Sequence, residues 1–117
     1  MPEYKLVISG SRELKGETHV SGGKNTSLAV IPAALLAEYP CQIENLPDIE
    51  DIRVLIRILR RLGAKVDWRA EEQQMQVDPG AVTSNTVPFA LSQKMRASYY
   101  LMGALLGRYG YARVGYP

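Results

Sequence analysis

The amino-acid sequence predicts an α/β fold made of repeated units, in which short strands alternate with buried helices. One observation is internal similarity, because residues 24–47 align without a gap on residues 94–117. A second is that both stretches contain a helix-like run that is apolar on every face, which is typical of helices buried within a protein. Chance similarity between two apolar helices is the alternative to a repeat. We expect a first unit over residues 22–80 and the first half of a second unit over residues 81–117.

The elements of the first unit follow from hydrophobic periodicity and turn residues. Strands are predicted near residues 5–8 and 17–20. The first helix is expected to follow the turn at Lys24 and to be apolar on every face over residues 28–37. Pro32 in its interior should kink or interrupt it because proline removes a backbone hydrogen bond. A short strand is expected over residues 42–44.

The most regular pattern predicts a helix over residues 49–62, with Asp48 as its N-cap and Gly63 as its stop. Its apolar face comprises Ile49, Ile52, Leu55, Ile56, Leu59 and Leu62. Its other side carries Arg53, Arg57, Arg60 and Arg61. We interpret these arginines as a solvated basic face rather than a ligand site.

The remaining sequence predicts a hairpin, a linker and a second helix. The hairpin strands are expected over residues 65–68 and 73–77, and the linker over the Pro-, Gly-, Ser- and Asn-rich residues 78–88. A second buried helix is expected over residues 92–106, capped near its start, and a last strand over residues 112–116.

Composition narrows the classes of partner. The chain has 117 residues, 46% hydrophobic and 22% charged, with a net charge of +2. This charge is too small to indicate a nucleic-acid partner, and no apolar run reaches about 18 residues, so we expect no membrane partner. There is no signal-peptide pattern, and the single cysteine suits a reducing compartment, so we expect a cytoplasmic protein.

The sequence holds one cysteine and one histidine, which together cannot form a metal site. We therefore expect neither a metal nor another cofactor. His19 is interpreted as a surface residue, and Cys41 as a small buried apolar residue rather than a nucleophile.

The segment Ser21-Gly22-Gly23-Lys24-Asn25 reads as an anion-binding turn. Its glycines let the backbone approach a ligand, the following helix start offers amide donors, and Lys24 adds a positive charge. The alternative is a plain strand-to-helix turn with an exposed lysine.

The similar segment Lys94-Met95-Arg96-Ala97-Ser98 also puts cations at a predicted helix start. A cation there is unfavourable by about 0.3–1 kcal/mol, which suggests a compensating anion such as a ligand phosphate or carboxylate. Tyr100, one helical turn after Arg96, is placed to line the same pocket. The alternative is that these side chains simply point into water.

Several motifs together resemble a known family: VSGGKNTSL, AALLAEYPCQIENLPDIEDI, LRRLGAKV, KMRAS and ARVGYP. In this order they are similar to the N-terminal part of UDP-N-acetylglucosamine 1-carboxyvinyltransferases, the enolpyruvyl transferases of peptidoglycan precursor synthesis. The sister enzymes that act on shikimate phosphate have a serine-rich turn with Asp-Lys-Ser. This chain has Gly23-Lys24-Asn25 there, which favours the sugar-nucleotide enzymes.

The resemblance implies part of an inside-out α/β barrel, with buried helices and outer sheets, in which residues 1–21 form strands that pair with a C-terminal domain. It implies phosphoenolpyruvate and UDP-N-acetylglucosamine as the partners of the full-length enzyme. By motif, Lys24 corresponds to a contact with phosphoenolpyruvate and Asn25 to a contact with the acceptor sugar. Arg96, with Ala97 and Tyr100 beside it, corresponds to the substrate site.

The resemblance assigns no catalytic residue to this chain, because the family's catalytic cysteine and its acid–base aspartate lie beyond the matched motifs. The first hypothesis is therefore an N-terminal fragment of an enolpyruvyl transferase that is inactive by itself and self-associates through unpaired edges. The alternatives are a stand-alone module that binds a phosphate or a sugar nucleotide, and a domain used only for scaffolding.

Overall fold

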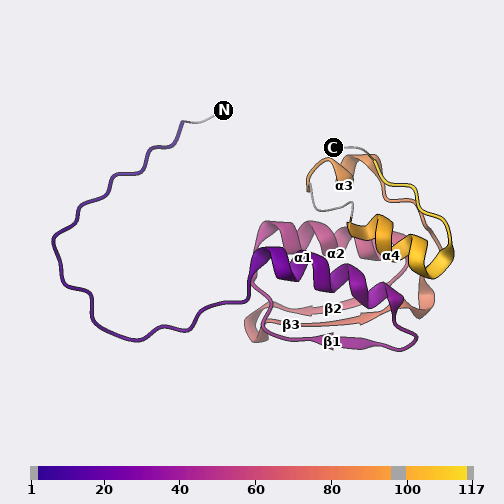
Figure 1. The fold of residues 1–117 in the computed structure, drawn as a ribbon, viewed down its shortest axis with the longest axis horizontal. Helices are drawn as coiled ribbons and strands as arrows, with labels where there is room; N and C mark the ends of the chain where they lie inside the picture. The colour runs from indigo at the N-terminus through magenta and orange to yellow at the C-terminus, as the bar shows by residue number, and fades with distance from the viewer. Residues whose placement is uncertain (1–2, 96–99, 116–117) are drawn as a thin grey trace.

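Two helices lie on one face of a three-stranded sheet, and a third packs beside the first (Figure 1). The structure is a computed structural model that describes residues 3–95 and 100–115. Its helices are α1 (Lys24–Ala33), α2 (Glu50–Leu62), the short α3 (Phe89–Ser92) and α4 (Tyr100–Tyr109), and its strands are β1 (Cys41–Ile43), β2 (Lys65–Arg69) and β3 (Gln74–Asp78). Short 3-10 turns, η1 (Ala34–Leu36), η2 (Ala70–Glu72) and η3 (Pro79–Ala81), link these elements.

The sheet is antiparallel, in the order β1-β3-β2. Met75 and Val77 of β3 are buried against the helices, while Gln74 and Gln76 alternate with them and point away. The predicted hairpin is therefore confirmed, since Val66 pairs with Val77 and β2 joins β3 through η2. The short strand predicted over residues 42–44 is also present, one residue earlier.

Helix α2 is the best-packed helix of the fold. Every residue predicted for its apolar face is buried except the half-buried Ile49, and Val54 and Ile58 are buried as well. Gly63 ends the helix as predicted, with a left-handed φ of 106° that favours glycine. The predicted N-cap is wrong. Ile49 holds that position without a side-chain cap, because Asp48 instead binds Arg53, with 3.0 Å between Oδ1 and an arginine nitrogen.

The basic face of α2 is exposed, as predicted. Arg53 and Arg57 both pair with Glu50, and Arg60 donates a 2.9 Å hydrogen bond to the carbonyl oxygen of Val66. The hydrogen bond and the negative charge of Asp48 raise the pKa of Arg53 above its usual value, because both favour the charged guanidinium.

Helix α1 begins at Lys24, where the sequence predicts the start of a helix after the Gly22-Gly23 turn. The chain changes from an α-helix to the 3-10 turn η1 just after Pro32, in agreement with the predicted interruption. Burial differs from the prediction. Leu28, Ile31 and Leu35 are buried, but Val30 and Leu36 are exposed, so the described residues cover one face of this helix and leave the other open.

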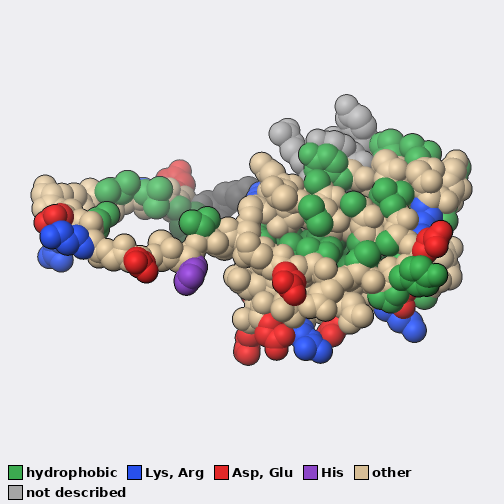
Figure 2. All heavy atoms as spheres, turned by 60° about the horizontal axis from the view of Figure 1, so that its bottom comes forward, with side chains coloured by type: hydrophobic (Ala, Val, Ile, Leu, Met, Phe, Trp, Pro, Cys, Tyr) green, Lys and Arg blue, Asp and Glu red, His purple; other side chains and the backbone are tan. Residues whose placement is uncertain are grey.

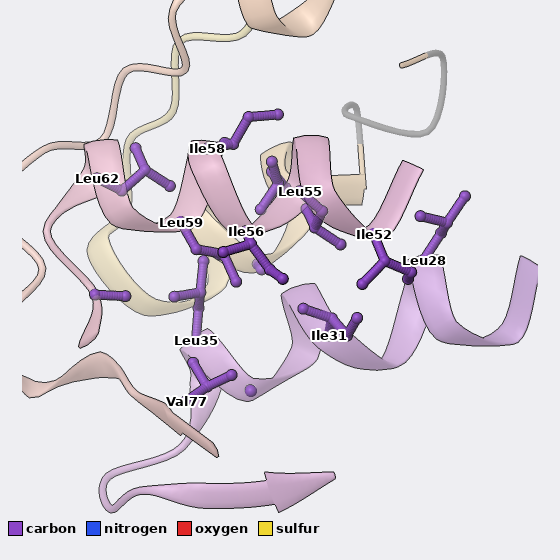
Figure 3. Close-up of a cluster of buried hydrophobic side chains, with 14 of the residues drawn as sticks. Leu28, Ile31, Leu35, Ile52, Leu55, Ile56, Ile58, Leu59, Leu62 and Val77 are labelled. Carbon is purple, nitrogen blue, oxygen red and sulfur yellow. The ribbon is translucent and has the colours of Figure 1, made fainter. Parts of the chain in front are cut away.

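The core lies between the helices and the sheet. Leu28 and Ile31 of α1 meet Ile52, Leu55 and other side chains of α2 in one buried cluster (Figure 3). Because these residues recur at helical spacing on both helices, the packing of α1 on α2 is set by complementary apolar stripes.

The two strands predicted near residues 5–8 and 17–20 are not formed. Residues 3–21 run as an extended segment away from the body (Figure 1), and within the described chain they belong to no strand. Apolar side chains of this segment, such as Leu6 and Ile8, are exposed. Figure 2 shows hydrophobic side chains along the segment that extends from the body. A strand needs a neighbouring strand to satisfy its backbone groups, and no described segment supplies one here.

The C-terminal third also departs from the prediction. Ser92 does not cap a long helix but ends α3, and its hydroxyl donates to the carbonyl oxygen of Phe89 at 2.9 Å. Helix α4 is described from Tyr100 and extends to Tyr109, past the predicted end. The strand predicted over residues 112–116 is absent from the described part, which contains only an isolated bridge between Thr86 and Arg113.

Candidate functional site

The turn before α1 presents the start of the helix to solvent. Gly23 is the N-cap, with extended backbone angles, and no described side chain caps the first turn. The carbonyl oxygen of Gly23 accepts two hydrogen bonds from Ser27, one from the backbone amide at 3.1 Å and one from the hydroxyl at 2.6 Å. The side chains of Lys24 and Asn25 are exposed. This arrangement leaves amide donors and an ammonium group at one helix end, as an anion site requires.

Beside this turn lies a hollow of about 230 Å³, between the first turn of α1 and the loop of residues 43–46. The backbone of Gly22 approaches the carbonyl group of Asn45 so closely that a Cβ atom would overlap it. Asn45 itself has a φ of 58°, in the left-handed region that asparagine tolerates better than most residues. Sequence reasoning missed Asn45, although an asparagine just before Leu46 and Pro47 is a recognisable turn signal.

The charge on Lys24 is balanced within the chain. Its Nζ lies 2.8 Å from Oδ2 of Asp51, near the start of α2. The sequence predicted that a ligand anion would compensate the charge at this helix start. In this structure the compensating anion is the side chain of Asp51. Asp51 is not predictable from the sequence as a partner of Lys24, because the pair depends on how α1 packs on α2.

The second predicted group of site residues is only partly described. Arg96 and Ala97 lie outside the described residues. Tyr100 is the first residue of α4 and is 43% exposed. Lys94 follows α3 in a turn, so the expectation that it begins a helix, as Lys24 does, is wrong.

The remaining residues considered as candidates are Cys41 and His19. Cys41 is half-buried rather than fully buried, since it begins the edge strand β1, and its Sγ lies 3.7 Å from the carbonyl oxygen of Tyr39. His19 is exposed, as expected. Within residues 3–95 and 100–115, no group of acidic, histidine or cysteine side chains is arranged to hold a metal ion. None of the helices described is both long and apolar enough to cross a membrane.

Comparison with known proteins relates nearly the whole chain to one group of enzymes. The chain is 47% identical to UDP-N-acetylglucosamine 1-carboxyvinyltransferase 3 of Caldanaerobacter subterraneus subsp. tengcongensis over 97% of its own length and 27% of that protein. It is 45% identical to UDP-N-acetylglucosamine 1-carboxyvinyltransferase 2 of Bacillus subtilis, over 97% of this chain and 26% of the relative. The chain thus spans about a quarter of the length of these relatives.

A solved structure agrees with the sequence comparison. The enolpyruvyl transferase NikO from Streptomyces tendae superimposes with a TM-score of 0.75 and 34% identity, over 85% of this chain and 23% of that one. The predicted α/β class is therefore confirmed, and the fold is part of an enolpyruvyl transferase fold. The family model of EPSP synthase (3-phosphoshikimate 1-carboxyvinyltransferase) matches residues 8–116. On these grounds the chain belongs to the EPSP synthase family of enolpyruvyl transferases.

Proposed function

We propose that this chain forms part of the substrate-binding wall of an enzyme that moves the enolpyruvyl group of phosphoenolpyruvate to the 3-hydroxyl of UDP-N-acetylglucosamine. The names of the relatives at 42–47% identity support this choice over shikimate phosphate as the acceptor. The turn Gly23-Lys24-Asn25 supports it as well, since it differs from the Asp-Lys-Ser turn of the sister enzymes. The reaction would serve peptidoglycan precursor synthesis in the cytoplasm.

The exposed ammonium of Lys24 beside uncapped helix amides is the observation that carries this proposal. Phosphoenolpyruvate carries a phosphate and a carboxylate, and both groups are favoured at such a helix start. In the proposed site Lys24 binds phosphoenolpyruvate and the Asn25 amide binds the acceptor sugar. Arg96 supplies a planar contact with an anion, near Ala97 and Tyr100.

By themselves, the 117 residues would be inactive in this proposal. Enolpyruvyl transfer develops charge in the transition state, and catalysis of this kind depends on preorganised charges in a site closed from water. The hollow beside Gly22 is open, and no catalytic acid, base or nucleophile has been identified among the described residues. Strands β1 and β2 are the two edges of the sheet, and strand edges can pair with another chain, which supports the further proposal that the isolated chain self-associates.

Steady-state kinetics of a full-length enzyme that carries this sequence would test the site. We expect Lys24→Ala and Arg96→Ala each to lower kcat/KM for phosphoenolpyruvate by about ten- to a hundredfold, because a charge-assisted contact contributes about 1.5–3 kcal/mol. Lys65→Ala is the matched control, since Lys65 is an exposed lysine on β2. Wild-type kinetics for Lys24→Ala, with folding confirmed by circular dichroism, would remove Lys24 from the site.

A further inference from the structure

The ion pair between Lys24 and Asp51 links the start of α1 to the best-packed helix of the chain. Lys24 is the first residue of α1, and Asp51 is the second residue of α2. The Asp51 side chain is 26% exposed, whereas that of Lys24 is 58% exposed. Asp51 also has the shorter side chain, with fewer rotatable bonds. The carboxylate is therefore the more firmly held partner, and it defines where the ammonium rests.

The position of Asp51 is fixed by its neighbours in the core. Ile52, the next residue, is fully buried and belongs to the same cluster as Leu28 of α1 (Figure 3). Leu28 lies one helical turn after Lys24, on the same side of α1. The contact that packs the two helices together therefore also sets the separation of the two charged residues.

Without the ion pair to Asp51, the Lys24 ammonium would be free to move away from this helix end. The positive end of α1 repels an ammonium group, and a lysine side chain is long enough to swing into water. Asp51 offsets this repulsion. An ammonium group has three donors, so a contact with one carboxylate oxygen leaves donors for a second anion.

Resting on the proposed function, we propose that Asp51 is a positioning residue for phosphoenolpyruvate, because it holds the Lys24 ammonium where the ligand's phosphate or carboxylate meets it. Asp51 acts through Lys24 and does not touch the ligand. The enzyme thereby binds the anion with a cation that is already ordered.

Two opposing effects decide whether the charge of Asp51 strengthens or weakens the binding of phosphoenolpyruvate. Ordering a free lysine side chain weakens binding by up to about ten- to thirtyfold. The negative charge of Asp51 also repels the ligand, but across the ammonium and in a water-like dielectric this costs about three- to fourfold before salt screening. Positioning outweighs repulsion, and removing the charge should weaken binding by about three- to tenfold.

The test is a double-mutant cycle in a full-length enzyme that carries this sequence, with phosphoenolpyruvate as the varied substrate. Asp51→Asn keeps the shape of the side chain and removes its charge. We expect it to raise the KM for phosphoenolpyruvate by about three- to tenfold, while kcat and the KM for UDP-N-acetylglucosamine change less than about twofold. In the Lys24→Ala background the same substitution should no longer raise the KM, and it should lower it by up to about three- to fourfold because only the repulsion between Asp51 and the ligand is removed. Glu50→Gln is the matched control, because Glu50 is in the same helical turn but pairs with Arg53 and Arg57.

An unchanged or lower KM for Asp51→Asn would overturn the proposal, and so would an equal effect of the substitution with and without Lys24. If Lys24→Ala itself leaves the kinetics unchanged, the proposed function of the turn fails and the positioning role fails with it. If Lys24→Ala weakens binding and Asp51→Asn does not, only the positioning role is lost. Should Asp51→Asn not fold, Asp51→Glu moves the charge by one methylene group, and an unchanged KM for that variant would equally count against the proposal.

Discussion

Gly22 marks the closest approach of two backbone segments around the candidate site. A Cβ atom at this position would overlap the carbonyl oxygen of Asn45. The loop that carries Asn45 has little freedom to move away, because the amide of Leu46 donates a 3.0 Å hydrogen bond to the carbonyl oxygen of Gln73. The absence of a side chain at Gly22 therefore lets the turn before α1 pack against the loop that carries Asn45.

We expect Gly22→Ala to lower the free energy of unfolding by about 1–3 kcal/mol, because the added methyl group must displace anchored backbone. Gly23→Ala is the matched control in the same turn. Its Cβ would meet Thr26 Oγ1 at 3.6 Å, an ordinary contact, and an alanine N-cap costs about 0.5–1 kcal/mol. Urea unfolding followed by circular dichroism measures both. Equal losses for the two variants would show that the contact with Asn45 does not limit this turn.

Among the elements, α2 connects the core to the charges of the site. One side of the helix is buried against α1 and the sheet, while its first turn carries Asp51 toward Lys24. Its exposed arginines bind acids of the same region, such as Glu50, and ion pairs of this kind contribute at most about 1 kcal/mol each. The stability of this helix therefore comes from its buried side rather than from its charged side.

The buried side of α2 can be tested at Ile52, which is fully buried. We expect Ile52→Val to lower the free energy of unfolding by about 0.5–1.5 kcal/mol and Ile52→Ala by about 2–5 kcal/mol. Both substitutions leave a cavity, and the cavity left by alanine is the larger. Arg57→Ala, on the exposed side, should change it by less than about 0.5 kcal/mol. Thermal and urea unfolding would give the three values. A larger effect from Arg57 than from Ile52→Ala would contradict this division of the helix.

How far the sequence predicts each element depends on where that element's partners lie. Helix α2 and the β2–β3 hairpin were predictable because periodicity, Gly63 and a short connection are all local signals. The strands expected near residues 5–8 and 17–20 were not, because a strand exists only with a neighbour that local sequence does not specify. The pair of Lys24 and Asp51 was missed for the same reason, since it arises from the packing of two helices.

At the scale of the whole molecule, the helices expose apolar side chains that no described residue covers. Val30 and Leu36 on the α1 side, and Met102 and Leu106 on α4, are each more than 40% exposed. The guanidinium of Arg108 in α4 donates to the carbonyl oxygen of Ala37, which ties α4 to the end of η1. Helices this apolar and this exposed indicate a body whose helical side is not covered by the described residues.

The isolated 117-residue chain is expected to show no enolpyruvyl transfer, because a single open wall cannot shield or stabilise the charged transition state. Phosphate release with phosphoenolpyruvate and UDP-N-acetylglucosamine, compared with a full-length enzyme in the same assay, is the measurement. Turnover above background that persists after repurification would contradict this expectation and would place a complete active site within these residues.

The extended segment of residues 3–21 has a consequence for solution thermodynamics. It lengthens the molecule, so that the radius of gyration is 17.0 Å where a compact chain of this length has about 13 Å. Its side chains are exposed in the folded chain and would be equally exposed after denaturation. The denaturant m-value and the heat-capacity change of unfolding scale with newly exposed surface, so this segment adds almost nothing to either. Both quantities should therefore match a smaller protein than 117 residues suggest, and deleting the segment should leave them nearly unchanged.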